Sequence, residues 1–238
     1  MRRDIVPADP AGALAGTPTM AGAFSFTAQV TDSTPGLPLQ GSVSCSISIA
    51  PAAPSGLPSP WQNQDIGSVQ KAGTATYASG TFTVTGDGSD IGGSKDAFQY
   101  VYQTANDDCT IVAKVLSVQN TDKAAKAGVM IRENLTAGAR HASVFVTPGE
   151  GIEFKSRTAT GGSTSTKRKK GLGAPYWVKV VRSGSTFTAY YSPDGSAWTS
   201  MGSVTVSMGS NVYIGLGVTS KKSGTLCTAT FNNVTATP

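Results

Sequence analysis

"TFTAYYSPDGSAWTSMGSVTV", residues 186–206, predicts two strands joined by a tight turn. Apolar and polar side chains alternate on both sides of Ser192–Gly195, the period of a half-buried strand. Pro193 suits the first central position of a β turn, Asp194 can bond its local backbone, and Gly195 accepts a positive φ. Trp198 begins the returning strand. We therefore interpret the stretch as an antiparallel hairpin, with contact to a sugar as the less favoured alternative.

The same alternation recurs from residue 61 to the end of the chain. The 238 residues are 39% hydrophobic and 14% charged, with 28 glycines and 13 prolines that separate short apolar runs. Many short strands without intervening helical periodicity indicate an antiparallel arrangement. We predict an all-β protein, built as a two-sheet antiparallel β-sandwich or jelly roll. No apolar run is long enough to cross a membrane, so we predict no membrane span.

Four regions follow from the composition. Residues 1–10 are predicted to be disordered, and residues 11–50 to form a short β segment from "AFSFTAQVTD" and "GSVSCSISIA". Residues 51–60 form a linker rich in proline and alanine, which marks a domain boundary. Residues 61–238 then form the sandwich. Two or three strands cannot bury both faces of a sandwich, so residues 11–50 are expected to pack on the next domain, pair with a second chain or stay disordered.

Two resemblances accompany these predictions. "GTPTMAGAFSFTAQVTDS" resembles the closing half of a bacterial immunoglobulin-like repeat, without the opening strands. The region from Trp61 onward resembles the concanavalin A-like lectin/glucanase sandwich family, through "WQNQDIGSV", "DGSDIGGSKDAFQYVYQ" and "APYWVKVVRSGSTFTAYYSPDGSAWTSMGS". Its members occur at the C-terminus of bacterial xylosidases and in large secreted bacterial proteins. The resemblance implies a concanavalin A-like fold in a secreted, extracellular, glycan-related setting. Gly92 departs from it, because members usually carry tryptophan there, and members often carry another tryptophan near Ala124–Ala125.

Side chains that could contact a sugar lie on four predicted strands. Trp177 and Lys179 share one strand face, and an exposed tryptophan is a platform for the C–H face of a pyranose. Burial in the core is the competing interpretation for Trp177. A second face, expected to hold Gln99, Gln103 and Arg132, could bond sugar hydroxyls or be a solvated outer face. The predicted carbohydrate-binding set is Trp177, Tyr190, Arg132, Gln99, Gln103 and Lys179.

Calcium is the only cofactor that the sequence suggests. "GDGSDIGGSKD" places Asp87, Asp90 and Asp96 in a glycine-rich segment, and calcium takes oxygen ligands from such loops. Ordinary turn formation is the alternative. Cys109 and Cys227 both point into the predicted core, and would form a disulfide if their strands were neighbours. Two buried free thiols are the alternative.

The sequence gives less support to nucleic-acid binding and to catalysis. The run Lys167–Lys170 is interpreted as a solvated hairpin tip, with attraction to acidic glycans as the alternative. It lacks interleaved aromatic residues, so nucleic acid is an unlikely partner. Catalysis would have to use Glu133, Glu150, Glu153 or His141, none of which lies in a recognisable catalytic motif.

The favoured interpretation is a secreted, non-catalytic module that binds polysaccharide. The first alternative is a structural or adhesive cell-surface module that self-associates through residues 11–50, whose open edge could accept a strand from a neighbouring copy. The second alternative is a glycoside hydrolase or a related carbohydrate-active enzyme.

Overall fold

The computed structural model describes residues 22–31, 40–49 and 56–237, and every regular element in them is a strand. The chain divides into two compact units, residues 1–53 and 54–238, which are described separately. Residues 1–10, predicted to be disordered, lie outside the described residues, as does the first half of the predicted linker. Within the described residues there is no helix that could span a membrane.

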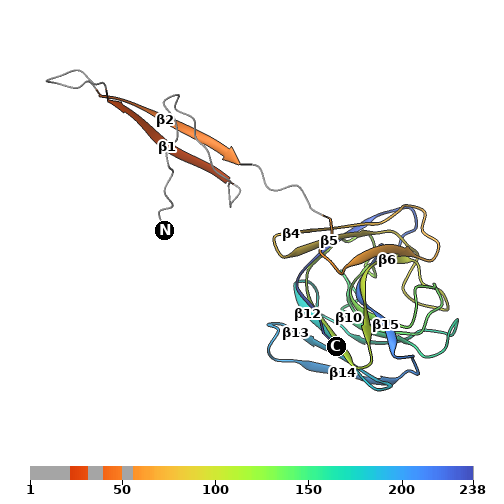
Figure 1. The fold of residues 1–238 in the computed structure, drawn as a ribbon. Coiled ribbons are helices and arrows are strands. Elements are labelled where there is room, and N and C mark those ends of the chain that lie inside the picture. Colours follow the sequence, from red (N-terminus) through yellow and green to blue (C-terminus); the bar gives the residue numbers. More distant parts are fainter. Residues whose placement is uncertain (1–21, 32–39, 50–55, 238) are drawn as a thin grey trace. The chain divides into compact units, whose positions relative to one another are not determined.

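The first unit contains one antiparallel hairpin, drawn in red to orange in Figure 1. It is formed by β1 (Gly22–Thr31) and β2 (Gln40–Ile49). Phe24 lies opposite Ile47, and Phe26 opposite Cys45. Directly opposed residues share a face of the sheet, so the alternating apolar residues of both strands gather on one side.

The second unit is a sandwich of two seven-stranded antiparallel sheets (Figure 1). Sheet I has the strand order β11, β10, β9, β8, β15, β6, β3, and sheet II the order β14, β13, β12, β7, β16, β5, β4. The strands of sheet I are β3 (Gln62–Ile66), β6 (Phe98–Asn106), β8 (Lys126–Arg132), β9 (His141–Val146), β10 (Ile152–Arg157), β11 (Ser165–Lys169) and β15 (Asn211–Thr219). Those of sheet II are β4 (Thr74–Ala78), β5 (Thr81–Gly86), β7 (Cys109–Val118), β12 (Tyr176–Ser183), β13 (Thr186–Ser192), β14 (Thr199–Thr205) and β16 (Cys227–Thr237). The predicted two-sheet, all-β architecture is confirmed.

The main core lies between the two sheets. In sheet II, Ile111 of β7 pairs with Val180 of β12, and both side chains are fully buried. In sheet I, Val129 of β8 pairs with Leu216 of β15, which are also fully buried and belong to the same apolar cluster. Full burial of one such aliphatic side chain stabilises the fold by about 1.5–3 kcal/mol. The period of two in the sequence therefore corresponds to the inward face of each sheet.

The two sheets differ in what covers their outer faces. In sheet II, buried residues alternate with half-exposed ones along β7 and β12, as expected for a sheet with one solvated face. In sheet I, every residue of β8, β9 and β10 is buried. Ile91, from the loop before β6, packs in a second apolar cluster with Tyr100 and Phe145. The protein's own loops therefore fill the outer face of sheet I.

The predicted disulfide between Cys109 and Cys227 is wrong, because both thiols are free and buried. Their strands β7 and β16 are indeed neighbours, but they run antiparallel. Ala229 lies opposite Val118, and Thr237 opposite Thr110, so the two cysteines lie at opposite ends of the pair. At about 3.3 Å per residue they are roughly 30 Å apart, far beyond the ~7 Å between Cα atoms that a disulfide allows.

Candidate functional site

The predicted polar face of Gln99, Gln103 and Arg132 does not exist, because these residues lie on opposite sides of sheet I. Gln103 of β6 lies opposite Ile214 of β15, which in turn lies opposite Ile131 of β8. All three therefore point toward the core between the sheets. Arg132 follows Ile131 by one residue and points to the outer face, because the side-chain period of a strand is two.

Gln99 and Gln103 are placed poorly for recognising a sugar. Gln99 is buried, and its side-chain amide donates a hydrogen bond of 2.7 Å to Asn63 Oδ1. Gln103 is half-buried and lines a pocket of about 180 Å³ at one end of the sandwich, with Ile214 and Ala236. Each amide thus belongs to the sandwich interior or its end, and not to an open sheet face.

Arg132 is fully buried and engaged within the protein. Its guanidinium carbon lies 5.2 Å from the ring centre of Phe98 and 5.8 Å from that of Tyr100. Its Nε donates a hydrogen bond of 2.7 Å to the carbonyl oxygen of Asn134. Burial lowers the pKa of Arg132, while the Asp96 carboxylate, 3.6 Å from Nη2, opposes that shift. Arg132 therefore acts as an anchor for the loop after β8.

Arg157 of β10 fastens three loops over sheet I. It forms an ion pair with Asp96 and donates to the carbonyl oxygens of Gly92, Gly162 and Ala139. These acceptors come from the loops before β6, after β10 and after β8. Five N–H donors on one planar group make arginine suited to such a junction. The outer face of sheet I is closed by this network.

The predicted calcium ligands Asp87, Asp90 and Asp96 do not converge on one point, because each binds its own protein partners. Asp87 accepts hydrogen bonds from the backbone N–H groups of Gln70, Lys71, Gly88 and Gly224. Burial alone would raise the pKa of Asp87, yet these N–H groups hold it below its ordinary value. Asp90 forms ion pairs of 2.8 Å with Lys126 and with Lys221, and Asp96 pairs with Arg157. Among the described residues no group of three metal-ligating side chains occurs.

The residues considered for catalysis are also engaged. Glu133 pairs with Arg140 at 3.4 Å, Glu150 with Lys123 at 3.0 Å, and Glu153 with Arg168. The Ser143 hydroxyl lies 3.2 Å from His141 Nδ1, but both side chains are fully buried. Burial, with nearby Arg157, Arg132 and Lys155, lowers the pKa of His141 well below its ordinary value. No substrate could reach this serine and histidine without opening the loops above them.

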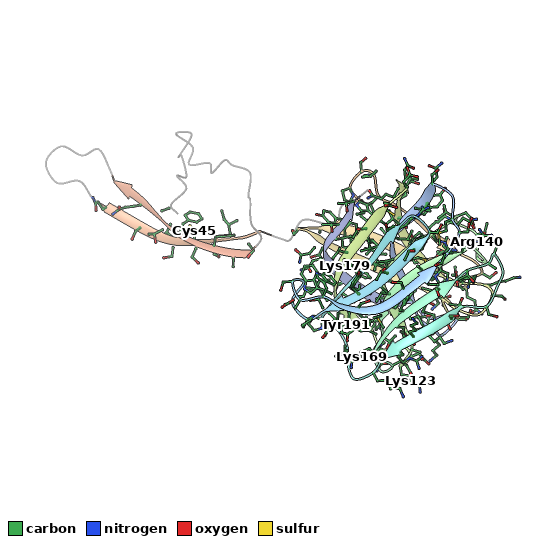
Figure 2. All side chains as sticks on the ribbon, turned by 90° about the horizontal axis from the view of Figure 1, so that it is seen from below. Cys45, Lys123, Arg140, Lys169, Lys179 and Tyr191 are labelled. Carbon is green, nitrogen blue, oxygen red and sulfur yellow. The ribbon has the colours of Figure 1, made fainter. Side chains whose placement is uncertain are left out.

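The outer face of sheet II carries a cluster of aromatic and basic side chains. Lys179 of β12 lies opposite Tyr190 of β13, and Trp177 opposite Lys114 of β7, so all four share this face. The Lys179 ammonium lies 4.7 Å from the ring centre of Tyr190 and 4.0 Å from that of Trp198. We call this set the aromatic face: Lys114, Trp177, Lys179, Tyr190 and Trp198. Lys179 is labelled in Figure 2.

The hairpin at residues 186–206 supports the aromatic face. The backbone N–H of Gly195 donates to Ser192 Oγ at 2.9 Å, and those of Ser196 and Ala197 to Asp194 Oδ1 at 2.8 Å. The N–H groups of Ala197 and Ser196 hold the pKa of Asp194 well below its usual range. Gly195 has a φ of +82°, and a Cβ there would lie 2.7 Å from Trp177 Cε2. The turn therefore packs on the Trp177 ring and covers part of it.

The sequence did not single out two members of the aromatic face as binding residues. Lys114 joins through the pairing of β7 with β12, which sequence alone does not specify. Trp198 was assigned to the end of the hairpin, and in the structure it lies over Lys179. Its position three residues after the glycine of the turn was the available signal.

The basic run Lys167–Lys170 differs from the predicted hairpin tip. Lys167, Arg168 and Lys169 lie in β11, the exposed edge strand of sheet I. Arg168 is paired with Glu150 at 3.0 Å and with Glu153. Lysines along an exposed edge hinder the addition of further strands, which is a sufficient reason for their presence.

Known structures share this architecture. A functionally unknown protein from Saccharomyces cerevisiae superposes with a TM-score of 0.58 at 16% identity, over 74% of this chain and 97% of that one. The pseudo β-1,3-glucanase of Mycobacterium tuberculosis gives 0.52 at 9% identity, over 78% and 95%. The carbohydrate-binding module CBM66 from Bacillus subtilis gives 0.50 at 18% identity, over 75% and 95%. The fold is a lectin/glucanase-like β-sandwich.

Among the comparisons with known proteins, only the comparison of structures finds similar proteins. No family model matches the sequence, and no curated protein matches it. At identities below 20% the three neighbours share the arrangement of strands with this chain. The two-sheet fold implied by the resemblance is thus confirmed.

Proposed function

We propose that this chain is a non-catalytic carbohydrate-binding module and that the aromatic face of sheet II binds polysaccharide. The observation that carries the proposal is the cluster of Trp177, Tyr190 and Trp198 with two lysines on a solvated sheet face. CBM66, whose name describes a carbohydrate-binding module, supports the proposal through its similar fold. A polysaccharide ligand further suggests that the protein is secreted and acts outside the cell.

The chemistry of the aromatic face suits a sugar chain. Aromatic rings pack against the apolar C–H faces of pyranoses, while the ammonium groups of lysine donate hydrogen bonds to hydroxyl or carboxylate oxygens. Partial burial lowers the pKa of Lys179, since its ammonium lies between two rings and has lost part of its water. Charged donors in such surroundings form stronger hydrogen bonds than solvated ones. Lys179 and Lys114 favour acidic sugars over neutral ones.

Sheet I is the less suitable alternative. Its outer face contains more aromatic residues, but Ile91 and the loops held by Arg157 cover them. A ligand there would have to displace a fully buried network of ion pairs. The aromatic face of sheet II requires no such rearrangement.

Affinity electrophoresis through gels containing neutral or uronic-acid polysaccharides tests the proposal. We expect retardation to be strongest in the acidic gels. Trp198→Ala should weaken the affinity for the polysaccharide roughly ten-fold, the loss of about 1.4 kcal/mol. Lys179→Met should reduce the preference for acidic gels. Lys222→Met is the matched control, because it removes one exposed lysine away from the aromatic face. Retardation that survives both Trp198→Ala and Tyr190→Ala, or none in any gel, would refute the proposal.

A further inference from the structure

The hairpin of β1 and β2 has one uncovered apolar face. Phe24, Val43 and Ile47 are 42%, 59% and 42% exposed, and they are the exposed large hydrophobic residues of the described chain. They share their face with Phe26, Cys45 and Ala28, while serine, threonine and glutamine residues, with Ala23, occupy the other face. Neither strand contains a charged residue. A two-stranded sheet is marginal in water by itself, so this face requires a partner.

The three central cross-strand pairs of this face decrease in size along the hairpin. The pair Phe24–Ile47 is large, Phe26–Cys45 is intermediate, and Ala28–Val43 is small. A second copy turned end over end would place its small pair over the large pair of the first. Two tapered layers stacked in this way fill the space between them evenly, as packed sheets require.

We propose that the apolar face of the hairpin binds the same face of a second copy of this chain. The two-fold axis lies between the layers, perpendicular to the strands, and passes near Phe26 and Cys45. Each face is uncharged and complementary in shape to itself, so an isologous dimer leaves no charged group unpaired. The hairpins form a small four-stranded sandwich, and each copy retains its own lectin/glucanase-like domain.

The contact area indicates a weak, reversible dimer. Ten residues per strand and two strands give a footprint of roughly 300 Å² per copy, from ~3.4 Å per residue and ~4.8 Å between strands. Stable interfaces bury about 800 Å² per partner, so the monomer and dimer should exchange with concentration. On a polysaccharide that holds many copies, the raised local concentration would favour the dimer.

The edges of the hairpin offer a second route to assembly, which the geometry disfavours. The outer edges of β1 and β2 have no neighbouring strand in the two-stranded sheet. Strand addition at an edge would give hydrogen-bond partners to the free backbone N–H and C=O groups of that strand. It would leave the apolar face exposed to water. Packing face to face covers Phe24, Val43 and Ile47 directly, which removes the main hydrophobic cost.

Cross-linking through Cys45 tests the face-to-face arrangement in the full chain. Cys45, labelled in Figure 2, is half-exposed, whereas Cys109 and Cys227 are buried. A bifunctional maleimide should therefore react with Cys45 alone. The axis brings the two Cys45 residues together across layers about 10 Å apart, too far for a direct disulfide but within reach of the reagent. We expect one cross-linked dimer band that Cys45→Ser abolishes. Its absence would overturn the proposal.

Sedimentation velocity over a concentration series supplies the second measurement. Phe26→Glu should weaken the dimer roughly hundred-fold or more, because two central side chains are lost per dimer. Thr27→Glu adds the same charge one residue away on the opposite face and should leave the dimer intact. Tryptophan fluorescence verifies the sandwich, since Trp61, Trp177 and Trp198 all lie in it. A monomer at every concentration, or assembly unaffected by Phe26→Glu, would show that another partner or an edge is used.

Discussion

Arg157 and Asp96 form a bidentate ion pair in which both side chains are fully buried. Nη2 lies 2.6 Å from Oδ1, and Nη1 lies 2.8 Å from Oδ2. Asp96 comes from the loop before β6 and Arg157 from the end of β10, so the pair joins segments 61 residues apart in the sequence. Arg132 lies 3.6 Å from the same carboxylate. One aspartate therefore compensates the charge of two buried arginines.

Replacing this aspartate should destabilise the protein strongly. Asp96→Asn leaves Arg157 and Arg132 buried without a carboxylate, a change that typically costs about 3–5 kcal/mol. Urea unfolding, followed by tryptophan fluorescence, measures the loss. Glu150→Gln is the control, because it removes one carboxylate from an ion pair with the exposed Lys123 and should change the midpoint little. Equal effects of the two substitutions would show that Asp96 has no special role.

His141 predicts a loss of stability in mild acid. Burial, with the charges of Arg157, Arg132 and Lys155, holds its pKa well below the ordinary 6.5, so the folded protein keeps it neutral. The unfolded chain binds a proton below that pH, and acidification therefore favours unfolding by up to about 1.4 kcal/mol per pH unit. Urea midpoints between roughly pH 7.5 and pH 5 should fall in the wild type, and fall less in His141→Gln. An unchanged slope in the variant would contradict this assignment.

Gly195→Ala tests how the hairpin turn supports Trp177. Alanine at a φ of +82° is strained by roughly 1 kcal/mol, and its Cβ would also meet the Trp177 ring at 2.7 Å. Gly184→Ala is the matched control, because its φ is +57° and no atom lies within 4 Å of its added Cβ. We expect Gly195→Ala to be the more destabilising and to shift the tryptophan emission. Equal effects on the unfolding midpoint would mean that only the backbone strain matters.

The three thiols should differ in reactivity. Burial raises the pKa of Cys109 and of Cys227 to about 11, so little thiolate forms near neutral pH. One thiol per native chain should therefore react rapidly with a monofunctional maleimide, and three after denaturation. A reducing agent should leave the melting temperature unchanged, since no disulfide is present between them. A lower melting temperature under reduction would restore the disulfide hypothesis.

Several features of this structure were accessible from residue patterns. Alternation of apolar side chains predicted the strands, because every second side chain of a strand lies on the inward face of its sheet, from which water is excluded. The turn chemistry of Ser192–Gly195 predicted the hairpin between β13 and β14. The alternation also placed Trp177 and Lys179 on a shared face opposite Val178 and Val180, which the structure confirms.

The predictions that depended on relations between strands were less successful. Gln103 and Arg132 were assigned to one face. Across β15, however, Gln103 is in register with Ile131, and Arg132, one residue later, points to the opposite face of the sheet. Asp87, Asp90 and Asp96 lie close in sequence, yet each turns to a different set of donors from distant segments. No local pattern encodes those partners.

From its sequence alone, this chain is determined to be an all-β sandwich with a separate N-terminal β segment, because burial with a period of two is a local property. Tertiary structure alone decided which outer face stays open: loops fastened by Arg157 cover sheet I, while sheet II presents Trp177, Tyr190 and Trp198. It also separated Cys109 from Cys227. These outcomes depend on strand direction, register and long-range ion pairs, which are set only when the whole chain packs.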